Sequence, residues 1–228
     1  MNKLILANFK SNKSVVNTNL WFEKFLKNVD TSVLNKLDVS VAPSFVALTM
    51  VKKLVDESGK NVTLSIQDIS SFPAGSYTGA ISGQNLSGLK IKYAIVGHSE
   101  RRKYFGETSH DVALKVGQSL QNGTTPVLCV DTEYLDEQLG LIDREELEKC
   151  VVAYEPISAI GNGKNADVGT VREVKEKIKR IAGNVPVIYG GSVDEFNINE
   201  YLMVSDGVLV GTACLDADQF IRVLEVVS

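Results

Sequence analysis

Eight short runs of apolar and β-branched residues recur along the 228-residue chain, and their starts lie about 23 to 35 residues apart. Nearly continuous hydrophobicity of this kind is typical of parallel strands that are covered on both faces. Helical patterns lie between the runs, so the repeating unit is a strand followed by a helix. The runs cover residues 4–7, 39–42, 62–66, 93–96, 126–130, 151–154, 185–189 and 208–210.

Apolar stripes with α-helical spacing separate several of the runs. Residues 108–111 (Thr-Ser-His-Asp) form a capping box, and Gly123 is placed to end the helix that follows. Residues 131–149 offer few apolar positions, so we expect one or two short helices there, with a break near Gly140. The stripes are Val15, Phe22, Leu26 and Val29; Val171, Val174, Ile178 and Ile181; and Ile221, Leu224 and Val227.

Eight strand–helix units in a chain of this length predict an α/β fold, a (β/α)8 barrel of eight parallel strands with outer helices. The outer helix after the fifth strand is expected to be shortened. A doubly wound sheet is the alternative, but it would need a glycine-rich fingerprint after the first strand, and Asn8-Phe9-Lys10-Ser11 is not one. Because no linker or low-complexity segment interrupts the pattern, residues 1–228 are predicted to be a single domain.

Composition argues against several classes of function. Hydrophobic residues make up 44% and charged residues 23%, the net charge is −4, and no basic run marks a nucleic-acid surface. The chain offers no signal peptide and no stretch near the roughly 18 apolar residues of a transmembrane helix. Three cysteines without a CxxC pair and two histidines without HExxH indicate neither a disulfide framework nor a metal site. We therefore expect a cytoplasmic protein without metal.

Polar residues and glycines follow the runs, at the barrel face where active sites lie. Glu155 follows the sixth run, Pro156 ends its sheet pairing, and a glycine-bounded loop comes next. This pattern indicates a base under a movable lid, although an isolated Glu-Pro pair is more often a solvated strand end. The other strand ends carry Asn8 and Lys10, Gln67 and Asp68, His98 to Arg102, Gly190 to Ser192, and Gly211 to Ala213.

The last two strand ends together predict a phosphate site. Gly190-Gly191-Ser192 lets the backbone approach a ligand closely. Gly211-Thr212-Ala213-Cys214 can open a short extra helix whose free N–H groups accept an anion. Loops after the seventh and eighth strands hold phosphate in many barrels of this architecture.

Three further side chains suggest the reaction. Lys10 is either a solvated loop lysine or a counter-charge for phosphate and a developing oxyanion. His98 is either a core or capping histidine or an imidazole kept neutral by a helix N-terminus and able to donate to a carbonyl. Glu100 can pair with Lys10, or with Arg101 or Arg102. With Glu155 as the base, this set favours proton abstraction next to a carbonyl through an enediolate.

These motifs, in this order along the chain, resemble those of triosephosphate isomerase, the standard example of such acid–base tuning on this barrel. The resemblance implies a TIM barrel and cofactor-free interconversion of dihydroxyacetone phosphate and D-glyceraldehyde 3-phosphate in glycolysis and gluconeogenesis. The motifs are Asn8-Phe9-Lys10, Gly97-His98-Ser99-Glu100-Arg101-Arg102, Ala153-Tyr154-Glu155-Pro156, Ala159-Ile160-Gly161, Tyr189-Gly190-Gly191-Ser192-Val193 and Leu209-Val210-Gly211.

The resemblance also implies site roles. Glu155 is the expected base and His98 the neutral electrophile, while Asn8 and Lys10 hold the substrate oxygens and Glu100 completes the catalytic group. Ile160 and Leu209 would press on Glu155 when the lid closes and raise the pKa of its carboxyl. The expected substrate-binding residues are Asn8, Lys10, Gly161, Ser192, Gly211 and Thr212, of which the last four hold the phosphate, mostly through backbone N–H groups. The expected lid is Pro156, Ile157, Ser158, Ala159, Ile160, Gly161, Asn162, Gly163 and Lys164.

The long polar loop at residues 71–80 is the element that, in the family, inserts into a partner subunit and braces the other active site near Asn8 and Lys10. The resemblance therefore predicts a homodimer, with Tyr77, Thr78 and Gly79 in the docking loop. A free surface loop is the alternative.

The chain departs from the family pattern at several positions. Ser158 stands where a Trp is usual at the lid's entry hinge, and Thr132, beside Asp131 in place of a Gly, stands where a Glu usually partners that Trp. Thr212 replaces a second Gly and would be strained if the position needed positive φ. Asp68 stands where an Asn is usual. Residues 131–149 are shortened relative to the family, with much of the outer helix after the fifth strand missing.

Two other functions fit the pattern less well. One is a barrel enzyme that isomerises or cleaves another phosphorylated metabolite. The other is a non-catalytic module that binds a phospholigand, which the presence of Lys10, His98 and Glu155 disfavours.

Overall fold

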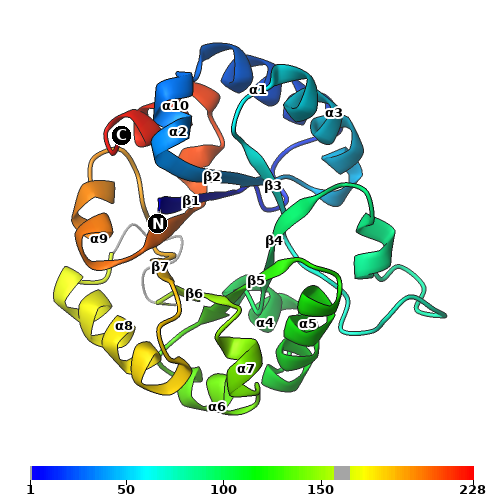
Figure 1. Ribbon diagram of the computed structural model, residues 1–228, viewed down its shortest axis with the longest axis vertical. Coiled ribbons are helices and arrows are strands. Elements are labelled where there is room, and N and C mark those ends of the chain that lie inside the picture. Colours follow the sequence, from blue (N-terminus) through cyan, green and yellow to red (C-terminus); the bar gives the residue numbers. More distant parts are fainter. Residues whose placement is uncertain (1, 157–164) are drawn as a thin grey trace.

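The computed structural model describes residues 2–156 and 165–228, in which eight parallel strands close into a barrel with helices outside it (Figure 1). Each strand pairs with the next, and β1 pairs with β8 to close the ring. The (β/α)8 barrel is therefore confirmed. The strands are β1 (Lys3–Asn8), β2 (Leu37–Ala42), β3 (Thr63–Ile66), β4 (Ile91–Val96), β5 (Thr125–Val130), β6 (Val151–Tyr154), β7 (Val187–Tyr189) and β8 (Gly207–Val210).

Helices cover the outside of the strands. The three predicted stripes fall on α1, α8 and α10, but Val15, Ile181 and Val227 at their ends lie outside the buried core. The helices are α1 (Val15–Asn28), α2 (Thr31–Lys36), α3 (Leu48–Ser58), α4 (Ser99–Phe105), α5 (Ser109–Gln121), α6 (Leu135–Gly140), α7 (Arg144–Leu147), α8 (Val168–Ala182), α9 (Ile198–Val204) and α10 (Ala217–Glu225), with 3₁₀ turns η1 (Phe45–Ala47), η2 (Gly83–Leu86) and η4 (Thr212–Cys214).

Both predicted ends of α5 are confirmed. Thr108 Oγ1 accepts a hydrogen bond from Asp111 N at 3.1 Å, and Asp111 Oδ2 accepts one from Thr108 N at 2.9 Å. Gly123 follows α5 in the left-handed region, at φ +71°. The stretch after β5 contains only the short helices α6 and α7, as expected from its few apolar residues.

Two layers of apolar side chains build the core because side chains alternate along a strand. Leu4 and Leu6 point into the barrel with residues of the other strands, whereas Ile5 and Ala7 pack against the helices. Filling the barrel leaves its ends as the places where polar side chains gather. The inner layer is Leu4, Leu6, Ala42, Tyr93, Ile95, Val127, Cys129, Val151, Ala153, Ile188 and Leu209.

Candidate active site

The carboxyl ends of the strands surround a cavity of about 210 Å³. Most of the predicted site residues line it: Asn8, Lys10, His98, Glu155, Ser192, Gly211 and Thr212. Glu100 lines an adjoining groove together with Asn8, Lys10 and His98. Pro156 is buried directly after Glu155, whereas the other predicted lid residues, 157–164 with Gly161 among them, lie outside the described residues.

Glu155 is almost fully buried, with 1% of its surface exposed. Its Oε2 accepts a hydrogen bond from Ser99 N at 3.2 Å, at the start of α4. Its Oε1 lies 3.3 Å from His98 Nε2 but has no hydrogen-bond partner among the described residues. One carboxylate oxygen is thus anchored, and the other is an unpaired acceptor beside the imidazole.

Gly190 and Cys129 shape the surroundings of Glu155; the sequence indicated Gly190 as part of the phosphate loop and did not indicate Cys129 as a site residue. A Cβ atom on Gly190 would lie 2.8 Å from Glu155 Cγ, so this position has no room for a side chain. Cys129 is fully buried, and its burial, with the nearby Glu155 carboxylate, raises the pKa of the thiol well above its usual value. The alternation of the fifth run could have placed Cys129 inside the barrel, but not beside Glu155.

His98 is the N-cap of α4, and its Nδ1 accepts a hydrogen bond from Glu100 N at 3.2 Å. An acceptor nitrogen carries no proton, so the ring proton of this tautomer sits on Nε2, which faces Glu155. His98 can therefore be both the helix cap and the neutral imidazole that donates to a carbonyl, because the capping hydrogen bond orients the ring.

Lys10 adopts φ +50°, an uncommon conformation for a residue with a side chain. Asn8 Oδ1 accepts from Lys10 N at 2.9 Å, and Gln67 Nε2 donates to Lys10 O at 3.0 Å, so both backbone groups are fixed. The Lys10 ammonium lies 2.7 Å from Glu100 Oε1. Glu100 thus pairs with Lys10, and no ion pair joins it to Arg101 or Arg102 in the described part of the chain. A strained backbone of this kind costs about 1–3 kcal/mol and typically occurs at functional sites.

Thr212 is tolerated where a glycine was expected. Within residues 2–156 and 165–228, Lys10 and Lys90 are the non-glycine residues with positive φ, so Thr212 carries no such strain. It begins η4, the short extra helix predicted after the eighth strand. Its exposed side chain lines the cavity, next to Gly211, where an added Cβ would lie 3.7 Å from Lys10 Cε.

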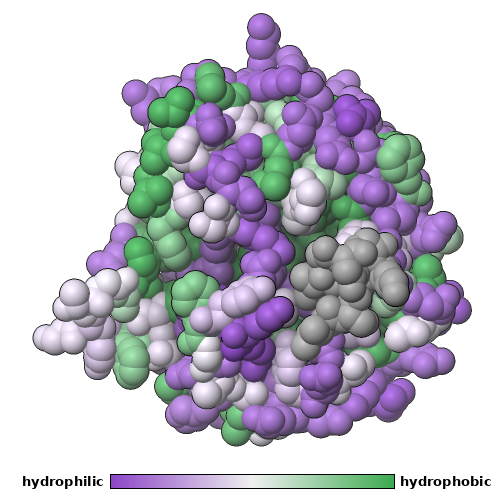
Figure 2. All heavy atoms as spheres, turned by 180° about the vertical axis from the view of Figure 1, so that it is seen from behind, coloured by the Kyte–Doolittle hydropathy of each residue, from purple (hydrophilic) through white to green (hydrophobic). Residues whose placement is uncertain are grey.

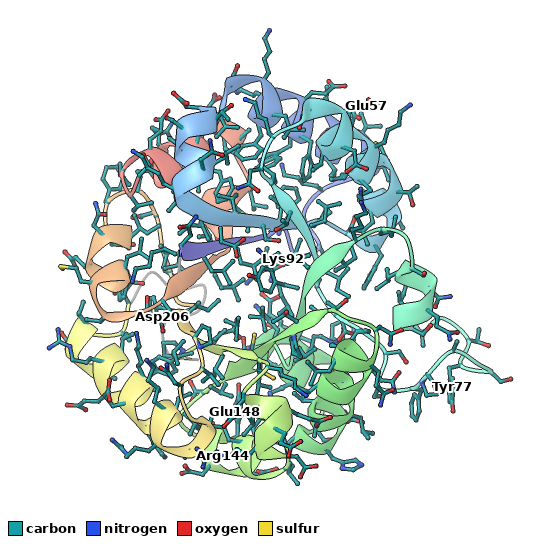
Figure 3. The ribbon with its side chains drawn as sticks, in the orientation of Figure 1. Glu57, Tyr77, Lys92, Arg144, Glu148 and Asp206 are labelled. Atoms are coloured by element: carbon teal, nitrogen blue, oxygen red, sulfur yellow. The ribbon has the colours of Figure 1, made fainter. Side chains whose placement is uncertain are left out.

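The loop at residues 71–80 stands out from the barrel between β3 and η2 (Figure 1). Phe72 and Tyr77 stack within it, with centroids 4.5 Å apart, and Tyr77 points away from the barrel (Figure 3). Viewed from behind, the loop forms a ridge at the left edge of the molecule (Figure 2). At its base, Asp68 pairs with Arg101 at 2.9 Å and with Lys115 at 2.6 Å.

The loop borders a groove of about 680 Å³ that also reaches Asn8, Lys10, His98 and Glu100. Phe72 and Phe105 line this groove and are exposed. A polar site and an open apolar groove therefore adjoin each other.

The described residues offer neither a metal-binding cluster nor a membrane-spanning helix. No three His, Cys, Asp or Glu side chains in this part of the chain are grouped so that they could hold a metal ion. None of its helices is both long and apolar enough to cross a bilayer.

Comparisons with known proteins agree with this geometry. A sequence model of the family described as triosephosphate isomerase matches residues 3–227. A protein of Mesomycoplasma hyopneumoniae (strain 232) named triosephosphate isomerase is 37% identical over 243 aligned positions, covering 98% of this chain and 99% of the relative. A protein of Mycobacteroides abscessus with the same name is 35% identical, covering 95% of this chain and 93% of the relative. The first alignment is longer than the 228-residue chain, so this chain has gaps relative to that protein.

Proposed function

The chain belongs to the triosephosphate isomerase family, and from this premise we propose how its own residues interconvert dihydroxyacetone phosphate and D-glyceraldehyde 3-phosphate, in glycolysis and gluconeogenesis. The reaction is an isomerisation in which a hydrogen moves between neighbouring carbons. The observation that carries the assignment is that Glu155, His98 and Lys10 come from three different strand ends and line one cavity.

Glu155 is the base in this proposal. Its unpaired Oε1 takes a proton from C1 of dihydroxyacetone phosphate, and the C–H electron pair forms the C1–C2 double bond of an enediolate. The same carboxylic acid then returns the proton to C2. Because Ser99 N holds Oε2, Oε1 is the carboxylate oxygen left to contact the substrate.

His98 and Lys10 stabilise the enediolate. The Nε2–H of His98 donates to the oxygens on C1 and C2 and passes a proton between them, and the Lys10 ammonium offsets their negative charge. Asn8 fixes the Lys10 backbone, and Glu100 holds the ammonium at 2.7 Å. These prepositioned groups act without reorganising as the charge develops.

The phosphate is placed at the loops that follow β7 and β8. Backbone N–H groups at Ser192, Gly211 and Thr212 are its proposed ligands, because these residues line the cavity at the ends of two neighbouring strands. Gly161 as a further ligand, and residues 156–164 as the lid, remain proposals from the family resemblance.

We further propose a homodimer in which the loop carrying Tyr77, Thr78 and Gly79 enters the partner's groove. The support is the open groove beside Lys10 together with the exposed, stacked Phe72 and Tyr77. A partner loop there would cover Asn8 and Lys10 from the side. A single barrel domain spanning residues 1–228 and a cytoplasmic location complete the proposal.

A coupled assay on purified protein, run in both directions at neutral pH, tests the proposed roles. Glu155→Gln keeps the shape but not the basicity, so we expect turnover to fall to background while binding of a phosphate analogue is retained. Glu145→Gln, at an exposed position of α7, is the matched control and should turn over like the wild type. Near-native kcat in Glu155→Gln would show that another group is the base.

A further inference from the structure

Arg102 makes a set of contacts that the proposed reaction leaves unexplained. From α4, its Nε donates to Gly97 O at 3.0 Å, its Nη1 to Ser109 Oγ at 3.3 Å, and its Nη2 to Gln138 Oε1 at 2.5 Å. Its guanidinium carbon also lies 4.1 Å from the centre of the Tyr134 ring. A side chain with donors directed at three partners has little rotational freedom left.

The first of these partners belongs to the turn that carries His98. Gly97 has φ +72°, and an added Cβ would lie 2.9 Å from Val112 and 3.0 Å from Arg102 Nη2. The turn is therefore packed between α5 and the guanidinium. Because Gly97 O is bonded to Arg102 and His98 is the next residue, the guanidinium fixes the peptide from which the imidazole projects.

The other partners come from the shortened stretch after β5. Gln138 is fully buried, and its amide makes a second bond, from Nε2 to Ser109 O at 3.2 Å. Tyr134 directly precedes α6 and supplies the face on which Arg102 rests. Gln138 and Tyr134 thus connect this short segment to Arg102 and to Ser109.

We propose that Arg102 is a positioning residue for His98, held in place by Tyr134 and Gln138. The guanidinium fixes the Gly97 carbonyl, the fixed turn aims the Nε2 of His98 at the cavity, and the Ser99 N–H that follows donates to Glu155 Oε2. The expected kinetic effects rest on the proposed isomerisation. The fixed orientation of the His98 ring does not depend on it.

The kinetic test uses Arg102→Gln and Arg102→Lys. We expect Arg102→Gln to lower kcat about 10- to 100-fold while KM changes less than about threefold, because a misaimed imidazole affects the reacting step more than phosphate binding. Arg102→Lys should fall in between, since an ammonium keeps the charge but not the planar fork. Arg180→Gln, exposed on α8, is the control and should match the wild type.

The structural test observes His98 directly. The chain has only two histidines, so ¹⁵N signals of the His98 ring can be assigned with a His110→Asn variant. In the wild type, one ring nitrogen should be proton-bearing and the other an acceptor. In Arg102→Gln, well below its unfolding temperature, these signals should move towards exchange between tautomers, which a mere loss of stability would not cause.

Two further variants keep the test decisive if Arg102→Gln does not fold. Gln138→Met and Tyr134→Leu each remove one support of the guanidinium, and each should lower kcat about 3- to 10-fold in the same direction. Unchanged His98 signals, or kcat within about twofold of the wild type in a folded Arg102→Gln, would overturn the proposal. Wild-type protein without turnover would instead refute the proposed function, and the ring signals would still test the positioning role.

Discussion

At the scale of single residues, Gly190 sets the space available to the proposed base. Its backbone does not need positive φ, so alanine fits its conformation, but the new Cβ would lie 2.8 Å from Glu155 Cγ and 3.4 Å from Oε1. Overpacking of this kind costs roughly 1–3 kcal/mol when the structure cannot move, and here the side chain that moves is the base.

Gly190→Ala should therefore lower kcat by about 10- to 100-fold with a smaller effect on folding. Steady-state kinetics and urea unfolding on the same preparation check this. Gly117→Ala is the matched control, because its Cβ would meet only Glu146 Oε1 at 3.8 Å, and alanine in α5 should stabilise the protein by about 0.5–1 kcal/mol. Equal kcat in the two variants would mean that Glu155 adjusts freely.

Site residues could be predicted from the sequence where they follow a strand directly. Glu155, His98 and Lys10 are of this kind, because the barrel brings all strand ends to one face. The Ser99 amide on Glu155 and the Arg102 bond to Gly97 could not be predicted, since both depend on how the turn after β4 is folded.

At the scale of elements, β7 and β8 form the shortest pairing in the barrel. The register joins them only at Tyr189 and Val208 within the described residues. The seventh run was expected to begin at residue 185, but β7 begins at Val187, after Pro186, which has no N–H to offer a neighbouring strand. Asp206 replaces the missing pairing: its N donates to Val187 O at 2.7 Å, and its Oδ2 accepts from Val187 N at 2.9 Å.

The charge of Asp206 should contribute to stability in a pH-dependent way. Burial alone would raise the pKa of its carboxyl, but the bond from Val187 and the Lys175 ammonium at 2.9 Å outweigh burial and lower the pKa below its ordinary value. A lowered acid pKa stabilises the folded state above the unfolded pKa of about 3.9, and this stability is lost as the pH falls through the folded pKa.

Asp206→Asn should thus lower the free energy of unfolding by about 1 kcal/mol at pH 7, and by progressively less below about pH 4. Urea unfolding of both proteins at a series of pH values measures the difference. Asp218→Asn, which breaks the exposed pair with Lys24, should change little at any pH. A difference for Asp206→Asn that grows on acidification would contradict the assignment.

Elements could be predicted where their pattern was long or marked by caps, as for α5 and α8. The six- and seven-residue helices α2 and α9 were not predicted, because so few residues show no reliable period. The longer α3 was also not named, although Leu48, Val51 and Val55 bury one face of it.

At the scale of the whole molecule, the eight strand–helix units explain why the barrel closes. They do not say whether the chain associates with a second copy. The exposed face near the protruding loop is the clearest sign of a partner. Phe105 is 72% exposed, and Phe72 and Tyr77 are about half exposed beside the groove that reaches Lys10. A contact here would cover apolar surface and enclose one side of the active site at once.

If that contact forms, activity should depend on it. Light scattering should give about twice the chain mass of 24.8 kDa. Tyr77→Asp places a charge in the contact and should yield a folded monomer with kcat roughly 100-fold lower, because Lys10 and the turn after β4 lose their bracing. Met203→Asp, at a more exposed position on α9, should remain dimeric and active, so that added charge alone is excluded as the cause. A wild type that is monomeric at assay concentration and fully active would instead leave the loop a free surface element, and the site would be complete within one chain.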